Sequence, residues 1–449
     1  MKREQQRTTS WRVWRGRVVK VGALALALHA TGCNADRANG PAVLQRRAAN
    51  IDGGNSIEAH RGHIVSATFV GVVPKSVAAQ MIGTFSAGAA FTARYDVEQW
   101  SIAYTTIDPR GELVTASAGV FFPIGAPGAV PLVSFSHGTE TVKSAVASNP
   151  ASINTHGIVN ASDGSAIVVA DYLGMGIDAV HPQAYLNAAI GAATSVDALL
   201  ATRRMANQRE VQLDGRLFVY GYSQGGQVAM ALLRELERNP RRGLTVTAGA
   251  PMSGPYDLYG SSKSYLTNPV SLKARSVNSI LAVTAAWQMY GIPDRLDELL
   301  IPPYDGIGLR IQSSGMTAAE LAAAVPFVSL DVLQPSFIES ILNDPDAPFS
   351  RAMRENETYD WAPRTPMRIY FAPGDLQVAP LNARVAIARM RELGAQNVDT
   401  VNLGPGLTHG TAQWPAFIDA RKWFDSFPVP AAADQDIDEA GLAVFNRPP

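Results

Sequence analysis

Short apolar runs alternate with helical patterns along most of the chain, and this alternation predicts the fold. Eight runs bounded by glycine, proline or polar residues are typical of strands: 97–107, 112–122, 130–136, 166–170, 217–220, 244–248, 367–371 and 398–402. Between several of them apolar residues recur at helical spacing, as in 187–207. Strands that alternate with helices favour a mostly parallel sheet with helices on both faces. The first two runs, joined by turn residues at 108–111, instead predict an antiparallel hairpin.

The interval 259–366 breaks this rhythm. It has few strand-like runs, and its apolar residues recur mainly at helical spacing. Capping-box patterns, which mark helix starts, occur at Thr317 with Glu320 and at Ser336 with Glu339. The interval therefore predicts a helical cap of the enzyme-lid kind, inserted after the sixth strand and covering the strand ends. A separate partner-binding domain is the alternative.

The first 32 residues have the layout of a signal peptide. Seven basic residues and one acid precede the apolar run 21–28, which is far shorter than the roughly 20 residues that span a bilayer. The only cysteine, Cys33, follows directly and resembles the lipidated cysteine of a bacterial lipobox, with Ala30 where leucine is usual. We therefore predict export to the periplasm or cell surface, with membrane attachment through Cys33. Plain secretion and a basic membrane-surface helix are the alternatives.

Composition and pattern divide the rest of the chain. The predicted parts are a tether and lead-in at 33–94, a core at 95–258 and 367–427, the cap at 259–366 and a tail at 428–449. Without residues 1–32 the chain keeps 31 basic and 38 acidic residues, a net charge of −7. An acidic chain without basic clusters is a poor nucleic-acid binder, which excludes nucleic acid as a partner. His60 and His63 lack a third ligand nearby, so no metal site is expected.

One stretch carries the strongest chemical signal. Residues 217–220 predict a buried strand, 221–225 read Gly-Tyr-Ser-Gln-Gly, and apolar residues at helical spacing follow. A strand, a tight turn and a helix around G-x-S-x-G leave the central serine hydroxyl exposed as a nucleophile. Ser223 is therefore the predicted nucleophile, and a solvated serine in a glycine-rich turn is the alternative.

A nucleophilic serine needs a base, and chain order selects the candidates. In hydrolases built around this turn, the acid and then the histidine follow the serine in sequence. His409 is the only histidine after Ser223, and it lies in a predicted loop after the eighth strand. Asp375 follows the seventh strand and is the predicted acid, and a turn aspartate that caps a helix starting near Pro380 is its alternative role. Asp360 is the second candidate, but it precedes that strand.

The oxyanion of an acyl-transfer reaction needs two backbone donors. The amide of Gln224, directly after the serine, is one candidate, and the loop after the third strand (134–140) provides the other. Gly138 allows a close approach there, so Thr139 is the predicted second donor. His137 precedes the serine in the chain and is interpreted as shaping this loop.

Several of these stretches resemble the secretory lipase family of α/β-hydrolases, the group that contains the yeast A-type lipase. The resemblance covers about residues 95–427 and rests on 104–111, 136–139, 170–176, 221–226 and the Pro-Gly-Asp375 and Thr-His409 loops. It implies an α/β-hydrolase fold with a helical cap inserted after strand six, and Ser223, Asp375 and His409 as nucleophile, acid and base. In some family members the oxyanion loop differs from the Ser-His-Gly-Thr of residues 136–139, so the family pattern supports the role of Thr139 less directly than those of the triad residues. Asp171 is interpreted as holding the loop after the fourth strand.

The sequence thus predicts a serine hydrolase that cleaves carboxylic esters of lipids or small molecules through an acyl-enzyme intermediate, without metal or organic cofactor. A serine peptidase of the prolyl-oligopeptidase type is one alternative, but too few residues precede the core to form the propeller domain usual in that class. A non-catalytic binding protein on the same fold is the other, and the presence of all three triad residue types disfavours it.

Overall fold

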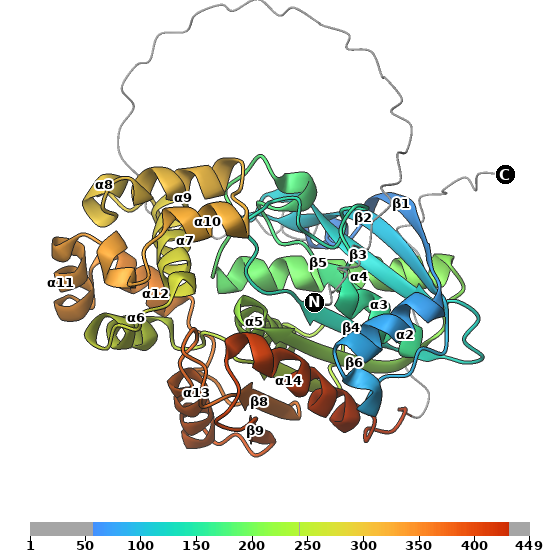
Figure 1. Cartoon of the computed structure of the whole chain (residues 1–449). Coiled ribbons are helices and arrows are strands. Elements are labelled where there is room, and N and C mark those ends of the chain that lie inside the picture. The colour runs from blue at the N-terminus through green and yellow to red at the C-terminus, as the bar shows by residue number, and fades with distance from the viewer. Residues whose placement is uncertain (1–56, 242, 431–449) are drawn as a thin grey trace, which may run out of the picture. The chain divides into compact units, whose positions relative to one another are not determined.

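A nine-stranded sheet forms the centre of the protein, with the order β1-β2-β3-β5-β4-β6-β7-β8-β9 (Figure 1). The computed structural model describes residues 57–430 except residue 242, so the predicted signal peptide, Cys33 and most of the C-terminal tail lie outside the described residues. The strands are β1 (Ile64–Val73), β2 (Val97–Ile107), β3 (Leu113–Pro123), β4 (Val130–Ser136), β5 (Ala166–Ala170), β6 (Leu213–Tyr222), β7 (Ala248–Met252), β8 (Met367–Phe371) and β9 (Val398–Asn402). β1, β2, β3 and β5 pair antiparallel in that order, and the remaining pairs are parallel.

Helices cover both faces of the sheet because successive side chains of a strand point to opposite sides. Leu217 and Val219 of β6 pack into an apolar cluster together with α4 (Ala188–Gln208), α5 (Gln224–Arg238) and α13 (Leu381–Glu392). Phe218 and Tyr220 of the same strand pack into a second cluster, with α2 (Lys75–Thr84), α3 (Thr155–Asp163) and α14 (His409–Phe424). The predicted mostly parallel sheet with helices on both faces is confirmed. Two short 3-10 turns, η1 (Ala87–Ala89) and η2 (Gly176–Asp178), lie in the connections.

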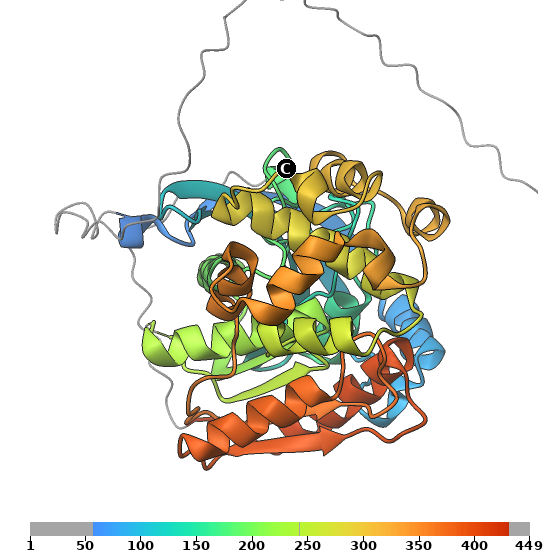
Figure 2. The same cartoon turned by 90° about the vertical axis from the view of Figure 1, so that its left-hand side faces the viewer.

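The residues between β7 and β8 form the helical cap. Its elements are α6 (Leu258–Thr267), α7 (Lys273–Tyr290), α8 (Leu296–Leu299), α9 (Tyr304–Ser313), α10 (Ala318–Ala324), the 3-10 turn η3 (Ser329–Val332), α11 (Pro335–Asn343) and α12 (Pro348–Glu355). Ile280 and Leu281 of α7 and Phe337 of α11 belong to an apolar cluster built mainly from cap residues. Figure 1 shows these yellow and orange helices gathered at one end of the sheet, and Figure 2 views them from the cap side. The insertion therefore has its own packed interior.

Two strands differ from the prediction. β1 is an additional strand inside the segment predicted as a lead-in, so the sheet has nine strands rather than eight. It lies at the sheet edge, and all of its residues are exposed or partly exposed. Because neither face of the strand is buried, its sequence does not show the alternation of apolar and polar residues that marks a strand. β7 begins at Ala248, where the predicted sixth strand ends. It reads Ala-Gly-Ala-Pro-Met, and glycine and proline are depleted in strands, so composition gives little signal for it.

The capping-box prediction is confirmed at one cap helix and wrong at another. At α10 the Thr317 amide donates to the Glu320 carboxylate at 2.8 Å, and the Glu320 amide donates to the Thr317 hydroxyl. At α11 the helix begins at Pro335, one residue before the predicted cap Ser336. Proline has a suitable fixed φ, and the N–H that it lacks would be unpaired in the first turn anyway.

Two acids mark the points where the chain passes between core and cap. Asp257 directly precedes α6, Glu357 follows α12, and the Thr358 amide donates to the Tyr256 carbonyl at 3.1 Å. Burial, and then the neighbouring Asp257 carboxylate, raise the pKa of Glu357 from 4.5 to about 7. Between pH 4.5 and 7 the Glu357 carboxyl group is protonated in the folded protein, whereas in the unfolded chain it has already lost its proton. The contribution of Glu357 to stability therefore falls as the pH rises from 4.5 to 7.

We expect Glu357→Gln, which copies the protonated acid, to raise the free energy of unfolding at pH 8. The increase should be on the order of 1 kcal/mol, because solvent screening at this partly exposed group reduces the value that the full pKa shift implies. Near pH 4 the variant and the wild type should unfold almost alike. Urea unfolding at both pH values measures the difference, with the exposed Glu339→Gln of α11 as control. An equal effect of Glu357→Gln at both pH values would contradict the assignment.

Candidate active site

The turn between β6 and α5 holds Ser223 in a strained conformation. Its φ is 62° and its ψ is −125°, a region that residues with side chains rarely adopt. Flanking glycines allow the turn to close. A Cβ on Gly221 would lie 2.3 Å from the carbonyl oxygen of Gly225, and a Cβ on Gly225 would lie 1.9 Å from that of Ser136. The turn therefore has the geometry that presents a serine hydroxyl at the carboxyl edge of the sheet.

His409 meets Ser223 from a segment distant in sequence. It is the first residue of α14, with Thr408 as the capping residue, rather than a loop residue as predicted. Its Nε2 atom lies 2.9 Å from the Oγ atom of Ser223. Its Nδ1 atom lies 2.6 Å from Oδ2 of Asp375. The structure thus brings the three predicted residues into one hydrogen-bonded row.

Asp375 lies buried in the turn between β8 and α13. Its second oxygen, Oδ1, accepts hydrogen bonds from the amides of Gln377 and Val378, each at 2.9 Å. One oxygen therefore holds the turn while the other contacts the imidazole. The alternative role, as cap of a helix starting near Pro380, is not seen, because α13 begins at Leu381 after Pro380 without a side-chain cap. Because a carboxylate only accepts, it favours the imidazole form with the proton on Nδ1 and with Nε2 free to accept from the serine. Asp360, the second candidate acid, instead accepts from Nε of Arg389 at 2.7 Å.

Tyr222 is a residue of the site that sequence reasoning missed. Its hydroxyl donates to the carbonyl oxygen of His409 at 2.5 Å, and the two ring centroids lie 5.1 Å apart. Burial raises the pKa of Tyr222 above its usual range, so the phenol remains a donor. This contact fixes the start of α14 against the end of β6. Tyr222 is the variable residue before the serine in the motif, a position that gives no sign of its tertiary partner.

The loop after β4 runs beside the serine. A Cβ on Gly138 would lie 3.8 Å from the Cβ of Ser223, which places the neighbouring Thr139 in the segment that meets the serine. The Thr139 hydroxyl lies 3.3 Å from the hydroxyl of Tyr185. Gln224 is the first residue of α5, where backbone amides have no partner within the helix. The oxyanion roles of Gln224 and Thr139 stay predictions.

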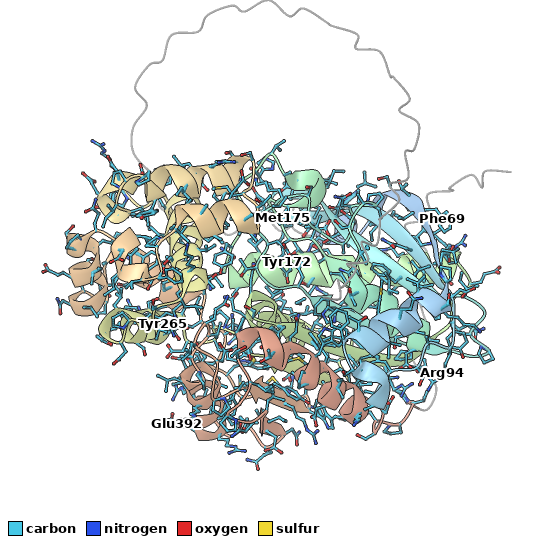
Figure 3. All side chains as sticks on the ribbon, in the orientation of Figure 1. Phe69, Arg94, Tyr172, Met175, Tyr265 and Glu392 are labelled. Atoms are coloured by element: carbon cyan, nitrogen blue, oxygen red, sulfur yellow. The ribbon has the colours of Figure 1, made fainter. Side chains whose placement is uncertain are left out.

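His137 and Asp171 contact this loop and its neighbours. The His137 ring stacks on Tyr172, labelled in Figure 3, with centroids 4.2 Å apart. The Tyr172 hydroxyl donates to the carbonyl oxygen of His137 at 3.0 Å. Asp171 is buried and accepts from the hydroxyl of Ser117 at 2.6 Å. The contacts between His137 and Tyr172 connect the loops after β4 and β5, and the contact of Asp171 with Ser117 holds the loop after β5 against β3. Both agree with the loop-shaping roles predicted for these residues.

A cavity of about 100 Å³ is lined by Ser223, Gln224 and the cap. Its apolar cap residues are Leu258, Leu266, Ala282, Val283, Leu333, Phe337, Ile341, Phe349 and Met353. Its polar residues on α7 are Arg275, Asn278 and Ser279. A mostly apolar cavity with a few polar groups is typical of a small-molecule site. The hydroxyl of Ser223 therefore lies where a ligand held by the cap could reach it.

The described part of the chain has neither a metal-binding cluster nor a membrane-spanning helix. No three His, Cys, Asp or Glu side chains of residues 57–241 and 243–430 form a group that could hold a metal ion. His60 and His63 lie as a pair, with ring centroids 5.5 Å apart. No helix among the same residues is both long and apolar enough to cross a membrane.

The fold of the chain matches solved structures of esterases and lipases. The rice cell wall degrading esterase LipA of Xanthomonas oryzae matches with a TM-score of 0.71 and 25% identity, over 81% of this chain and 96% of its own. This chain has the α/β-hydrolase fold. A protein of Legionella pneumophila matches with a TM-score of 0.73 and 24% identity over 81% and 98% of the two chains. Lipase A of Candida antarctica matches with a TM-score of 0.61 and 15% identity over 85% and 86%.

The predicted similarity to the yeast A-type lipase is thus confirmed at the level of the fold. Neither a scan of protein-family models nor a search of curated proteins finds a match. The α/β-hydrolase fold accounts for the position of the site. Each part of the site follows a parallel strand: Gly138 follows β4, Ser223 follows β6, Asp375 follows β8 and His409 follows β9. The carboxyl ends of these strands lie at one edge of the sheet.

Proposed function

We propose that this α/β-hydrolase is a serine hydrolase that cleaves carboxylic esters. The observation that carries the proposal is the hydrogen-bonded row from Asp375 through His409 to Ser223, with distances of 2.6 and 2.9 Å. A strained serine in contact with a base, and a base in contact with a buried acid, form the arrangement that serine hydrolases use. The esterases and lipases among the similar structures favour an ester over an amide as substrate.

The mechanism follows from this geometry. His409 Nε2 accepts the hydroxyl proton of Ser223 while Oγ attacks the carbonyl carbon of the ester. Asp375 stabilises the imidazolium that forms and keeps the ring oriented. The amides of Gln224 and Thr139 stabilise the negative charge on the carbonyl oxygen. His409 then gives its proton to the leaving alcohol, and a water molecule activated by the same imidazole hydrolyses the acyl-enzyme.

A fluorophosphonate probe tests the proposed class. The reagent phosphonylates an activated serine, so we expect labelling at Ser223, identified by mass spectrometry of the modified peptide. His409→Ala should remove the labelling because the base is lost. A 4-nitrophenyl ester and the matching 4-nitroanilide then separate an esterase from the alternative peptidase. A folded wild-type protein that takes no label and hydrolyses neither substrate would be a binding protein.

The proposed export and lipid attachment rest on the sequence of residues 1–33. The basic, apolar and small-residue segments support export, and the position of Cys33 directly after them supports its lipidation. When cells that express the protein are grown with a radioactive fatty acid, the protein should become labelled. The substitution Cys33→Ser should abolish this labelling. Labelling that survives this substitution would contradict attachment at Cys33.

The cavity predicts that the cap sets the preference for chain length. Leu266 of α6 lines the cavity, and Leu266→Trp fills part of its volume. We expect hydrolysis of octanoate and longer 4-nitrophenyl esters to fall at least about tenfold relative to acetate, because the longer chain loses its apolar contacts. Leu309→Trp on α9, at a position 42% exposed and outside the cavity, is the matched control. Equal scaling of all esters by Leu266→Trp would mean that the cap acts only on stability.

A further inference from the structure

One charged side chain differs from the rest of the cavity lining. Arg275 of α7 lines the cavity and is only 6% exposed. Its Nε atom has no hydrogen-bond partner. Within residues 57–241 and 243–430 no carboxylate forms an ion pair with Arg275, although the Asp375 carboxylate, which contacts His409, acts on it electrostatically. Taking a guanidinium out of water without an anionic partner is costly, so buried arginines are normally paired. The cavity thus contains a positive charge that no carboxylate of the described residues pairs with directly.

The contact that Arg275 does make holds the guanidinium in place. Its Cζ atom lies 4.0 Å from the ring centroid of Tyr265 on α6, labelled in Figure 3. The Tyr265 hydroxyl donates to the carbonyl of Gln377 at 3.3 Å and accepts from the amide of Ala379 at 3.2 Å. Both partners belong to the segment that follows Asp375. The cation–π contact stabilises the charge over the aromatic face but provides no acceptor for the guanidinium N–H groups.

Helix α7 places Arg275 at the polar end of a helix face that lines the cavity and becomes apolar toward its other end. The cavity-lining residues of α7 recur at the spacing of one helix face and are Arg275, Asn278, Ser279, Ala282 and Val283. The first three make a polar end and the last two an apolar end. Arg275 lies in the first turn of α7, where the helix dipole adds positive potential. The polar end therefore favours an anion, and the apolar end favours methylene groups.

We propose that Arg275 binds a carboxylate of the substrate, so that the preferred substrates are esters that carry a free carboxylate at a distance from the ester bond. The proposal rests on the proposed ester hydrolysis at Ser223 and names its substrate class. The planar guanidinium can donate two parallel hydrogen bonds to a carboxylate. The apolar wall at Ala282 and Val283 contacts the chain between the carboxylate and the ester carbonyl. Arg275 is then a specificity-determining residue.

The test compares each ester with a neutral analogue of nearly the same shape. The first pair is mono(4-nitrophenyl) adipate and its methyl ester, with the carboxylate on the acyl side. The second pair is the butyrate ester of 4-hydroxybutanoate and its methyl ester, with the carboxylate on the alcohol side. The wild type should have the higher kcat/KM for the carboxylate member of at least one pair, and that pair identifies the side that Arg275 contacts.

Arg275→Gln should reduce this preference ratio by about 10- to 100-fold, the range of one hydrogen-bonded contact to a charged group. Arg275→Lys keeps the charge without the planar fork and should retain part of the ratio. Lys273→Gln is the matched control, because it removes one positive charge from the same helical turn at a residue that does not line the cavity. Its ratio should equal that of the wild type.

Inhibition of the wild type gives a second measurement that requires no folded variant. Adipate should inhibit competitively at concentrations where 1,6-hexanediol does not. A wild type that prefers the neutral ester in both pairs, or an Arg275→Gln that slows both members equally, would overturn the proposal. In either case, Ser223-dependent hydrolysis of the neutral esters would leave the proposed function standing. Absence of Ser223-dependent hydrolysis of every ester would instead overturn the proposed function.

Discussion

Ser223→Ala is expected to lower kcat on the best ester substrate by on the order of 10⁵- to 10⁶-fold, the scale of loss when a triad serine is removed. The substitution deletes the Oγ atom that lies 2.9 Å from Nε2 of His409. The imidazole can then activate only water, and without an acyl-enzyme the reaction loses the two-step route. The oxyanion donors and the cavity remain, so a residual rate above that in water is expected.

Folding of the variant should be unaffected, because the strained backbone at φ 62° is equally unfavourable for serine and alanine. Melting temperature and circular dichroism verify this, and kcat for 4-nitrophenyl butyrate measures the loss. Ser253→Ala is the matched control, since Ser253 is also buried, follows β7 and has a positive φ of 43°. A Ser223→Ala protein that keeps a tenth of the wild-type rate would require a different nucleophile.

The residues that meet at Ser223 could be selected from the sequence because local pattern and chain order restrict the choice. The serine lies in a motif whose small residues are required by the turn itself. His409 is the only histidine after it, and Asp375 follows the strand that must precede the acid. Contacts that depend on how separate elements pack could not be read in this way. The bond from Tyr222 to the His409 carbonyl depends on where α14 begins, and no pattern in either segment encodes it.

The lining of the cavity could be predicted from the sequence even less well than the contacts of the triad. Arg275 reads as an ordinary basic residue in the first turn of a helix, and nothing in its neighbours predicts burial. It becomes buried because α6 places Tyr265 over its guanidinium and because the cap closes on the core. In the sheet, Pro251 argues against a central strand by propensity, yet β7 pairs with strands on both sides. Packing between distant segments decides both cases, and sequence spacing does not report it.

Asp375→Asn is expected to lower kcat by on the order of 10⁴-fold, less than the loss of the serine. Two backbone amides explain why an isosteric change should have so large an effect. Oδ1 accepts from Gln377 and Val378, so the asparagine carbonyl takes that side and its amino group faces Nδ1 of His409. Two donors cannot face each other, so the imidazole moves its proton to Nε2. That proton then points at Ser223, and the ring cannot act as its base.

Nitrogen NMR of the imidazole measures this directly, with the proton on Nδ1 in the wild type and on Nε2 in Asp375→Asn. Asp360→Asn is the matched control, because it removes the second candidate acid, which pairs with Arg389 instead, and should change kcat by less than about twofold. A loss under tenfold in Asp375→Asn, or a proton still on Nδ1, would show that another group orients the ring. Because the three residues act as one unit, Asp375→Asn combined with Ser223→Ala should be no slower than Ser223→Ala alone. Losses that multiply would mean that Asp375 stabilises the transition state by a route independent of the serine.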